Sequence, residues 1–143
     1  MIIIMIASFI GSIAFAVLYR IPKRLLIISG LVGMLGMATS EMAALYVNQV
    51  TAIFIGATTT ALISELFARW IREPSILFLI PGIFPLVPGG KAYMTMLSFL
   101  RNDYVTGIEE LASTVFMAGA IAGGIIVVSS VFRFSRNRLA KIG

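Results

Sequence analysis

Long uncharged runs separated by short basic segments dominate the chain. The first run covers residues 1–19, and a helix of that length, rising ~1.5 Å per residue, nearly matches the ~30 Å hydrocarbon core of a bilayer. Further apolar runs occupy residues 25–40, 50–68, 75–100 and 111–132. The pattern predicts an all-α integral membrane protein, folded as a single transmembrane domain over residues 1–143 and crossing the bilayer five times.

Composition supports the bilayer as the solvent. Hydrophobic residues make up 59% of the chain and charged residues only 12%, with a mean hydropathy of +1.04. A soluble domain of 143 residues cannot bury that much apolar surface, since small domains leave much of their surface exposed. These values exclude a soluble enzyme, a nucleic-acid-binding protein and a disordered tail.

The chain also lacks the residues that most often carry catalysis or bind metals. It contains neither cysteine nor histidine, so it has no thiol nucleophile, no thiolate metal site and no imidazole base. It also has no paired intramembrane aspartates and no Gly-x-Ser-x-Gly sequence, which argues against an intramembrane enzyme. We therefore expect no enzymatic activity, no metal and no cofactor.

Basic residues are distributed unevenly between the two sides of the predicted spans. Nine of the 11 Lys and Arg residues fall in the segments after the first, third and last runs, whereas the other side keeps only Lys91 and Arg101. Because cytoplasmic loops are enriched in Lys and Arg, we expect the N-terminus outside and the C-terminus in the cytoplasm. An odd number of spans agrees with this orientation only if residues 75–100 cross the membrane fully.

The middle of the fourth predicted span is broken by proline and glycine. Six of the ten residues at 81–90 are Pro or Gly, and the prolines leave the carbonyls of Leu77, Pro81 and Phe84 without their usual helical donors. Unpaired backbone at membrane depth is tolerated only where protein or a watery cavity satisfies it. The block predicts a discontinuous helix whose two half-helices converge on a substrate. The alternative is a surface loop between two short interfacial helices.

The direction of such a break determines which groups it binds. Carbonyl groups at the end of the first half-helix suit an ammonium group, while free N–H groups near Gly89, Gly90 and Lys91 suit a carboxylate. This arrangement matches an amino acid, and it matches a dicarboxylate only if the anionic end dominates. Lys91 shares one helix face with Thr95, so it either faces a cavity or extends its amine to the membrane surface.

Two further features lie outside the break. Glu65 is the one acidic residue inside a predicted span, so it is either a proton-carrying carboxylate or one half of an intrahelical pair with Arg69. Small-residue faces that favour close helix packing are formed by Gly30, Gly33 and Gly36 and by Gly119 and Gly123.

The sequence at residues 81–93, Pro-Gly-Ile-Phe-Pro-Leu-Val-Pro-Gly-Gly-Lys-Ala-Tyr, resembles the signature of the threonine/serine exporter family. The likeness covers most of the chain and is to the small subunit, which corresponds to the membrane C-terminal half of one-chain members. Ala68, Arg69 and Pro74 fit as well, although the family pattern does not require Lys91.

The resemblance implies a multi-pass protein of a prokaryotic plasma membrane that exports serine or threonine by proton antiport. It also implies a separate, larger membrane subunit and allows a higher-order oligomer. The alternatives are a dicarboxylate (succinate) exporter subunit and a structural subunit that supports the partner's pathway. In either case no nucleic acid is involved.

The candidate substrate-binding residues come from the break, the signature and the start of the second half-helix. They are Pro81, Gly82, Pro85, Pro88, Gly89, Gly90, Lys91, Tyr93 and Thr95. Glu65 is the candidate for proton coupling.

Overall fold

A computed structural model describes residues 1–139 of the chain, with side chains up to Phe134, and every regular element in this part is helical. The α-helices are α1 (Ile2–Leu18), α2 (Leu26–Ala44), α3 (Gln49–Ile71), α4 (Ile76–Ile83), α5 (Gly89–Leu100) and α6 (Tyr104–Leu139). Two 3₁₀ turns, η1 (Lys23–Leu25) and η2 (Phe84–Leu86), precede α2 and follow α4. The all-α prediction is confirmed, while Lys141 of the basic tail lies outside the described residues.

Several of these helices are long and apolar enough to cross a bilayer. Within the described residues there are three such segments, Lys23–Ala44, Gln49–Ile71 and Tyr104–Phe134. The segments Ile76–Leu86 and Gly89–Leu100 are long and apolar enough to cross a bilayer only when they are taken together as one span. They are bent by 49° at the break between them. With 17 residues, or ~25 Å, α1 is a shorter apolar helix. The chain is therefore a multi-pass membrane protein with three or four candidate spans plus α1.

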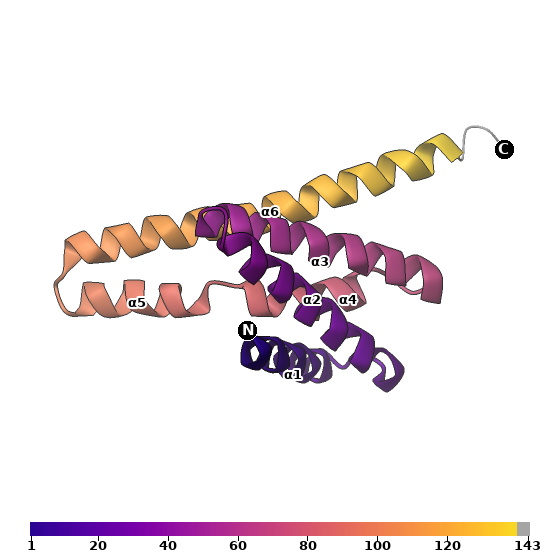
Figure 1. Cartoon of the computed structure of the whole chain (residues 1–143), viewed down its shortest axis with the longest axis horizontal. Coiled ribbons are helices and arrows are strands. Elements are labelled where there is room, and N and C mark those ends of the chain that lie inside the picture. Colours follow the sequence, from indigo (N-terminus) through magenta and orange to yellow (C-terminus); the bar gives the residue numbers. More distant parts are fainter. Residues whose placement is uncertain (140–143) are drawn as a thin grey trace.

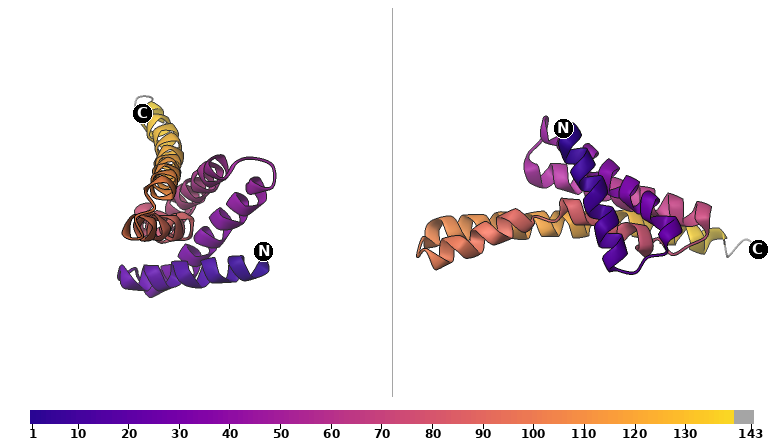
Figure 2. Two further views of the ribbon diagram at one scale, coloured as in Figure 1. Left: turned by 90° about the vertical axis from the view of Figure 1, so that its left-hand side faces the viewer. Right: turned by 90° about the horizontal axis from the view of Figure 1, so that it is seen from below.

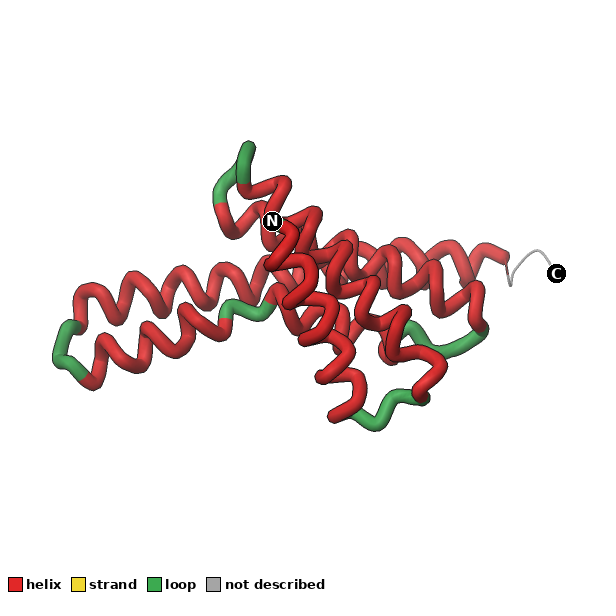
Figure 3. The backbone as a smooth tube through the Cα atoms, turned by 60° about the horizontal axis from the view of Figure 1, so that its bottom comes forward, coloured by secondary structure: helices red, strands yellow, loops and turns green. Residues whose placement is uncertain are grey.

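The helices form a bundle with a hairpin projecting from one end. In Figure 1, α5 and the first part of α6 run side by side away from the other helices, and the same hairpin stands clear of the bundle in Figure 3. Helix α5 packs mainly against α6. Figure 2 shows that α1 runs across the long axis of the molecule, which α6 follows.

Local capping explains where two of the helices begin. The Asn48 side chain accepts a hydrogen bond from the Thr51 amide at 2.9 Å and so caps α3, while Asp103 accepts one from the Thr106 amide at 3.2 Å at the start of α6. Because of this second cap, α6 starts at Tyr104 rather than at residue 111, where we expected the last span to begin. Its 36 residues span ~54 Å, more than the hydrocarbon core requires.

The glycines of α2 allow neighbouring helices to approach closely, as predicted. A Cβ added at Gly33 would lie 1.9 Å from Oγ of Ser12 in α1, and one at Gly36 would lie 1.9 Å from Oγ1 of Thr60 in α3. At Gly30 the nearest atoms belong to α1 side chains, at 2.8 Å. Helix α2 therefore packs between α1 and α3, and its backbone at these glycines contacts side chains of both neighbours.

The glycines of α6 differ from the expectation. Gly119 is exposed and has no atom within 4 Å of an added Cβ, so within the described chain it makes no close contact. Gly123 faces the Phe54 ring at an ordinary 3.5 Å. The close approach to α3 occurs one residue later, at Gly124, where an added Cβ would lie 2.9 Å from the Thr58 amide nitrogen.

Candidate functional site

The helix break is narrower than the ten residues predicted for it. Helix α4 continues through Pro81, η2 continues to Leu86, and the helical path is lost only at Val87, whose backbone is extended (φ −64°, ψ 127°), and at Pro88, which precedes α5. Pro81 and Gly82 are helical and buried in the bundle rather than part of the break.

Two of the three carbonyls freed by the prolines, those of Leu77 and Phe84, find partners within the described chain. The Leu77 carbonyl, which loses its helical donor to Pro81, lies 3.3 Å from Oγ of the fully buried Ser29. This hydroxyl shares its one proton between Leu77 and the Leu25 carbonyl of its own helix, at 3.0 Å. The Phe84 carbonyl accepts one from the Val87 amide at 3.2 Å. Helix α4 therefore keeps its proline inside the bundle because α2 supplies the missing donor.

A pocket of about 430 Å³ opens beside the break, and we call it the break pocket. It lies between the C-terminal end of α2, the start of α3, the break itself and α6. Its lining comprises Met37, Ser40, Glu41, Ala44, Gln49, Ala52, Ile53, Pro85, Leu86, Val87, Pro88, Gly89, Gly90, Lys91 and Met117. The break thus forms one wall of a cavity that residues of three other helices complete.

Five of the predicted substrate-binding residues meet in this pocket, and four do not. Pro85, Pro88, Gly89, Gly90 and Lys91 line it. Pro81 and Gly82 instead pack inside the bundle, where an added Cβ on Gly82 would lie 2.7 Å from the Val32 side chain. Tyr93 is 64% exposed, and Thr95 is buried with its hydroxyl donating to the Lys91 carbonyl at 2.9 Å.

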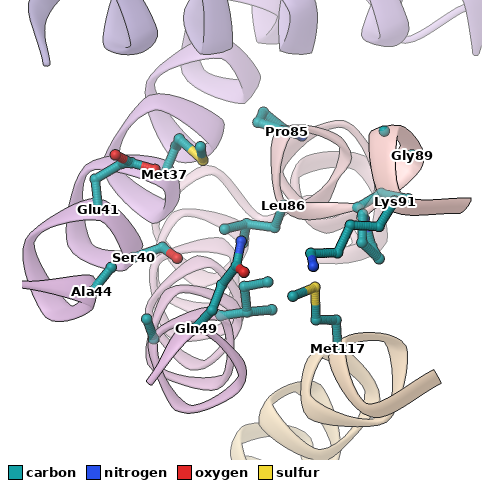
Figure 4. A pocket seen from close by; sticks show the side chains of 15 residues that line it. Met37, Ser40, Glu41, Ala44, Gln49, Pro85, Leu86, Gly89, Lys91 and Met117 are labelled. Carbon is teal, nitrogen blue, oxygen red and sulfur yellow. The ribbon is translucent and has the colours of Figure 1, made fainter. Parts of the chain in front are cut away.

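Lys91 provides the positive charge of the pocket. Its Nζ lies 3.4 Å from Oε2 of Glu110 in α6, and both side chains are about one-third exposed (33% and 31%). Figure 4 shows its amine extending into the pocket rather than back along α5. The chain itself therefore supplies a counter-charge for Lys91.

The start of α5 contributes backbone donors next to this amine. No side chain caps the helix, and a Cβ added to Gly89 or Gly90 would meet no atom within 4 Å, so a ligand can approach the backbone there. Together with Lys91, the first turn of α5 suits a carboxylate.

Two polar residues opposite Lys91 were missed from the sequence. Glu41 at the end of α2 and Gln49 at the start of α3 line the pocket. In Figure 4 the Gln49 amide extends toward the Lys91 amine, while the Glu41 carboxylate lies farther away, beside Met37. The sequence predicts for Glu41 only a position outside or near the outer face of the membrane, and it assigns no role to Gln49. The signal that could have identified them is their position at the ends of helices that pack against the broken segment.

Glu65 lies near the opposite end of α3, away from the break pocket. It accepts a hydrogen bond from Ser75 Oγ at 2.9 Å, and the expected pair with Arg69 is not formed in the described part of the chain. Instead the Arg69 guanidinium carbon lies 4.4 Å from the centre of the Phe132 ring.

These features define a class of protein before any comparison is made. An all-helical, multi-pass membrane protein with a polar pocket at a broken helix has the construction of a secondary transporter. The model of the family described as threonine/serine exporter, ThrE, matches residues 4–131, and the chain belongs to this family.

One relative shows which fraction of a longer family member this chain covers. It is 29% identical over 132 residues to a threonine/serine exporter of Corynebacterium glutamicum, and the alignment covers 92% of this chain but only 27% of that protein. The chain therefore spans about a quarter of that relative's length. No solved structure matches the chain.

Proposed function

We propose that the chain is the membrane subunit of a two-component secondary transporter that exports serine or threonine, coupled to the proton gradient. The observation that carries the proposal is the break pocket, where Lys91 and the start of α5 face Glu41 and Gln49. Membership of the threonine/serine exporter family supports it.

The charges of the pocket favour an amino acid over a dicarboxylate. Lys91 and the N–H group of Gly90 suit the substrate carboxylate, since the Gly89 N–H donates to the Val87 carbonyl at 2.7 Å. Glu41 offers an acceptor for the ammonium group. The Gln49 amide can donate to or accept from a hydroxyl such as that of serine or threonine. A second carboxylate in place of the ammonium group would face Glu41 and be repelled.

Glu65 is the coupling residue in this proposal. It is a partly buried carboxylate in a candidate span, and its hydrogen bond from Ser75 links α3 to the start of α4. A carboxylate at that position can take a proton from one side of the membrane and release it as the broken helix moves.

A larger membrane subunit completes the proposed transporter. The relative from Corynebacterium glutamicum is almost four times as long as the region it shares with this chain, and in this proposal the larger subunit corresponds to part of that additional length. The assembly, a heteromer open to higher-order oligomerisation, lies in a prokaryotic plasma membrane. In this proposal the N-terminus of the chain lies outside and its C-terminus in the cytoplasm. The five spans are α1, α2, α3, the α4–α5 pair and α6.

Counterflow in liposomes tests the substrate. Vesicles containing this chain and its partner, preloaded with unlabelled serine or threonine, should accumulate the labelled amino acid, and a pH gradient should stimulate its movement. Vesicles containing the partner alone are the control. Accumulation of labelled succinate without serine or threonine would instead show a dicarboxylate exporter, and full activity of the partner alone would leave this chain a structural subunit.

A further inference from the structure

A second polar pocket lies near the far end of α3, and we call it the basic-end pocket. Its volume is about 250 Å³, and it is lined by Glu65, Arg69, Ser75, Ser129, Phe132 and Arg133. Glu65 follows Ile53, which lines the break pocket, by 12 residues along α3, a helical distance of ~18 Å. The two pockets are therefore separate and lie at different levels of the bundle.

The two arginines of the basic-end pocket have N–H groups available to a ligand. The two ion pairs of the described side chains are Arg24–Glu73 and Lys91–Glu110, so neither Arg69 nor Arg133 is neutralised by a described carboxylate. The Arg69 guanidinium carbon lies 4.4 Å from the centre of the Phe132 ring, a cation–π contact that uses none of the N–H groups of this arginine as hydrogen-bond donors. Planar guanidinium groups match the geometry of a carboxylate better than an ammonium group does.

The same pocket contains an acceptor of opposite charge. Ser75 donates to Oε1 of Glu65, so this carboxylate is fixed by one hydrogen bond and keeps acceptor capacity for another donor. Two cations, one anion and the Ser129 hydroxyl thus surround a cavity large enough for a small zwitterion.

We propose that the basic-end pocket binds the main-chain carboxylate and ammonium groups of a free amino acid. Arg69 and Arg133 bind the carboxylate, and Glu65 binds the ammonium group. This inference rests on the proposed function, because an exporter must capture its substrate from the cytoplasm, the side to which the basic residues of α3 and α6 are assigned. A lipid phosphoethanolamine headgroup carries the same pair of charges and is the other source to be distinguished.

The absence of cysteine from the chain allows a direct test. In Ser129→Cys the new thiol is unique and lies in the basic-end pocket, so its rate of alkylation by a small water-soluble maleimide reports occupancy. L-Threonine should slow alkylation several-fold, in the parent background and in Lys91→Met, whereas threonine methyl ester and N-acetylthreonine, each lacking one charge, should not. Ser130→Cys, at the next residue and outside this pocket, is the matched control.

Charge removal identifies the residues that bind. In the Ser129→Cys background, Arg69→Gln should raise the threonine concentration needed for half-protection about ten- to a hundredfold, as expected for the loss of a charge-assisted contact. Arg72→Gln removes the same charge three residues away, outside the pocket, and should leave that concentration unchanged. Equal effects of the two variants would contradict a binding role for Arg69.

Counterflow on the same preparations separates this inference from the proposed function. Transport of threonine without protection of the Ser129→Cys thiol would overturn the basic-end site and leave the exporter proposal intact. Protection without transport would support the site and contradict export. Protection by phosphoethanolamine but not by threonine would identify a lipid headgroup as the ligand and overturn the amino-acid assignment.

Discussion

At the scale of single residues, Lys91 is the side chain for which two roles can be separated by mutation. It forms an ion pair with Glu110 at 3.4 Å and also lines the break pocket. Because each side chain is about one-third exposed, the ion pair itself contributes about 1 kcal/mol or less to stability. A substrate carboxylate bound by the same amine would make the residue matter far more for affinity than for folding.

Lys91→Met should therefore weaken substrate binding about ten- to a hundredfold while the protein still folds and assembles. Glu110→Gln is the matched variant, since it breaks the same ion pair but leaves the amine free for substrate, and it should bind as well as the parent or better. The measurement is the apparent affinity for labelled threonine in counterflow. Equal losses in the two variants would mean that only the ion pair matters.

Ser29 offers a second prediction at this scale. Its hydroxyl donates to the Leu77 carbonyl that Pro81 deprives of a helical donor, and the side chain is fully buried. Ser29→Ala should lower the free energy of unfolding by about 1–3 kcal/mol, the cost of a buried group left unpaired, seen as a lower Tm in detergent.

Ser64→Ala is the control for Ser29→Ala. Ser64 is equally buried, and both hydroxyls donate to a carbonyl of their own helix, that of Leu25 for Ser29 and that of Thr60 for Ser64. Only Ser29 also reaches a carbonyl that lacks its helical donor. Ser64→Ala should therefore lower the free energy of unfolding by clearly less than Ser29→Ala does. If both variants lower the Tm equally, the loss reflects burial in general and not the carbonyl released by Pro81.

At the scale of helices, the contact between α2 and α3 depends on backbones that nearly touch. A Cβ added at Gly56 would lie 2.8 Å from the Gly36 carbonyl oxygen and 2.7 Å from the Ser40 Cβ. Since a backbone atom cannot move aside as a flexible side chain can, Gly56→Ala should destabilise the fold by about 1–3 kcal/mol. A lower Tm in detergent would show this.

Gly119→Ala provides the opposite expectation on α6. An added Cβ meets no atom there within 4 Å, so the change should be neutral or stabilise the helix by up to ~1 kcal/mol. A strong loss of stability or of subunit association in Gly119→Ala would show instead that another chain contacts this face.

The sequence predicts most of the helices because their signals are local. Apolar runs and Gly spacing are properties of consecutive residues, and they predict α2, α3 and the close-packing face of α2, but not which helices contact that face. The extent of the break was less predictable, because Pro81 continues the helix only when a donor from another helix, Ser29, replaces the lost bond. That donor lies 48 residues away in the chain.

The lining of the break pocket was only partly predictable from the sequence, for the same reason. Gly89, Gly90 and Lys91 are contiguous and stood out in the sequence, whereas Glu41 and Gln49 reach the pocket through the packing of α2 and α3. Glu110 joins Lys91 because α6 folds back along α5, a pairing that no local pattern encodes.

At the scale of the whole molecule, the two pockets lie at different levels of one bundle, and α3 carries residues of both. Helix α4 and its break connect these levels, because Ser75 at the start of α4 bonds Glu65 while Pro88 at the other end lines the break pocket. A movement of the broken helix would therefore act on both pockets.

The last prediction concerns the sides of the membrane on which the two termini lie, and it depends on whether α1 crosses the membrane. Lys and Arg counts predict a C-terminus in the cytoplasm, and with five crossings the N-terminus would lie outside. Yet α1 is only 17 residues long and runs across the long axis of the molecule (Figure 2). Reporters fused before Met1 and after Gly143, one active only in the cytoplasm and one only outside, measure both ends. We expect the N-terminal fusion outside and the C-terminal fusion inside. Both ends in the cytoplasm would leave four crossings and place α1 along the membrane surface, and a C-terminus outside would reverse the orientation and assign the basic-end pocket to the wrong side for substrate capture.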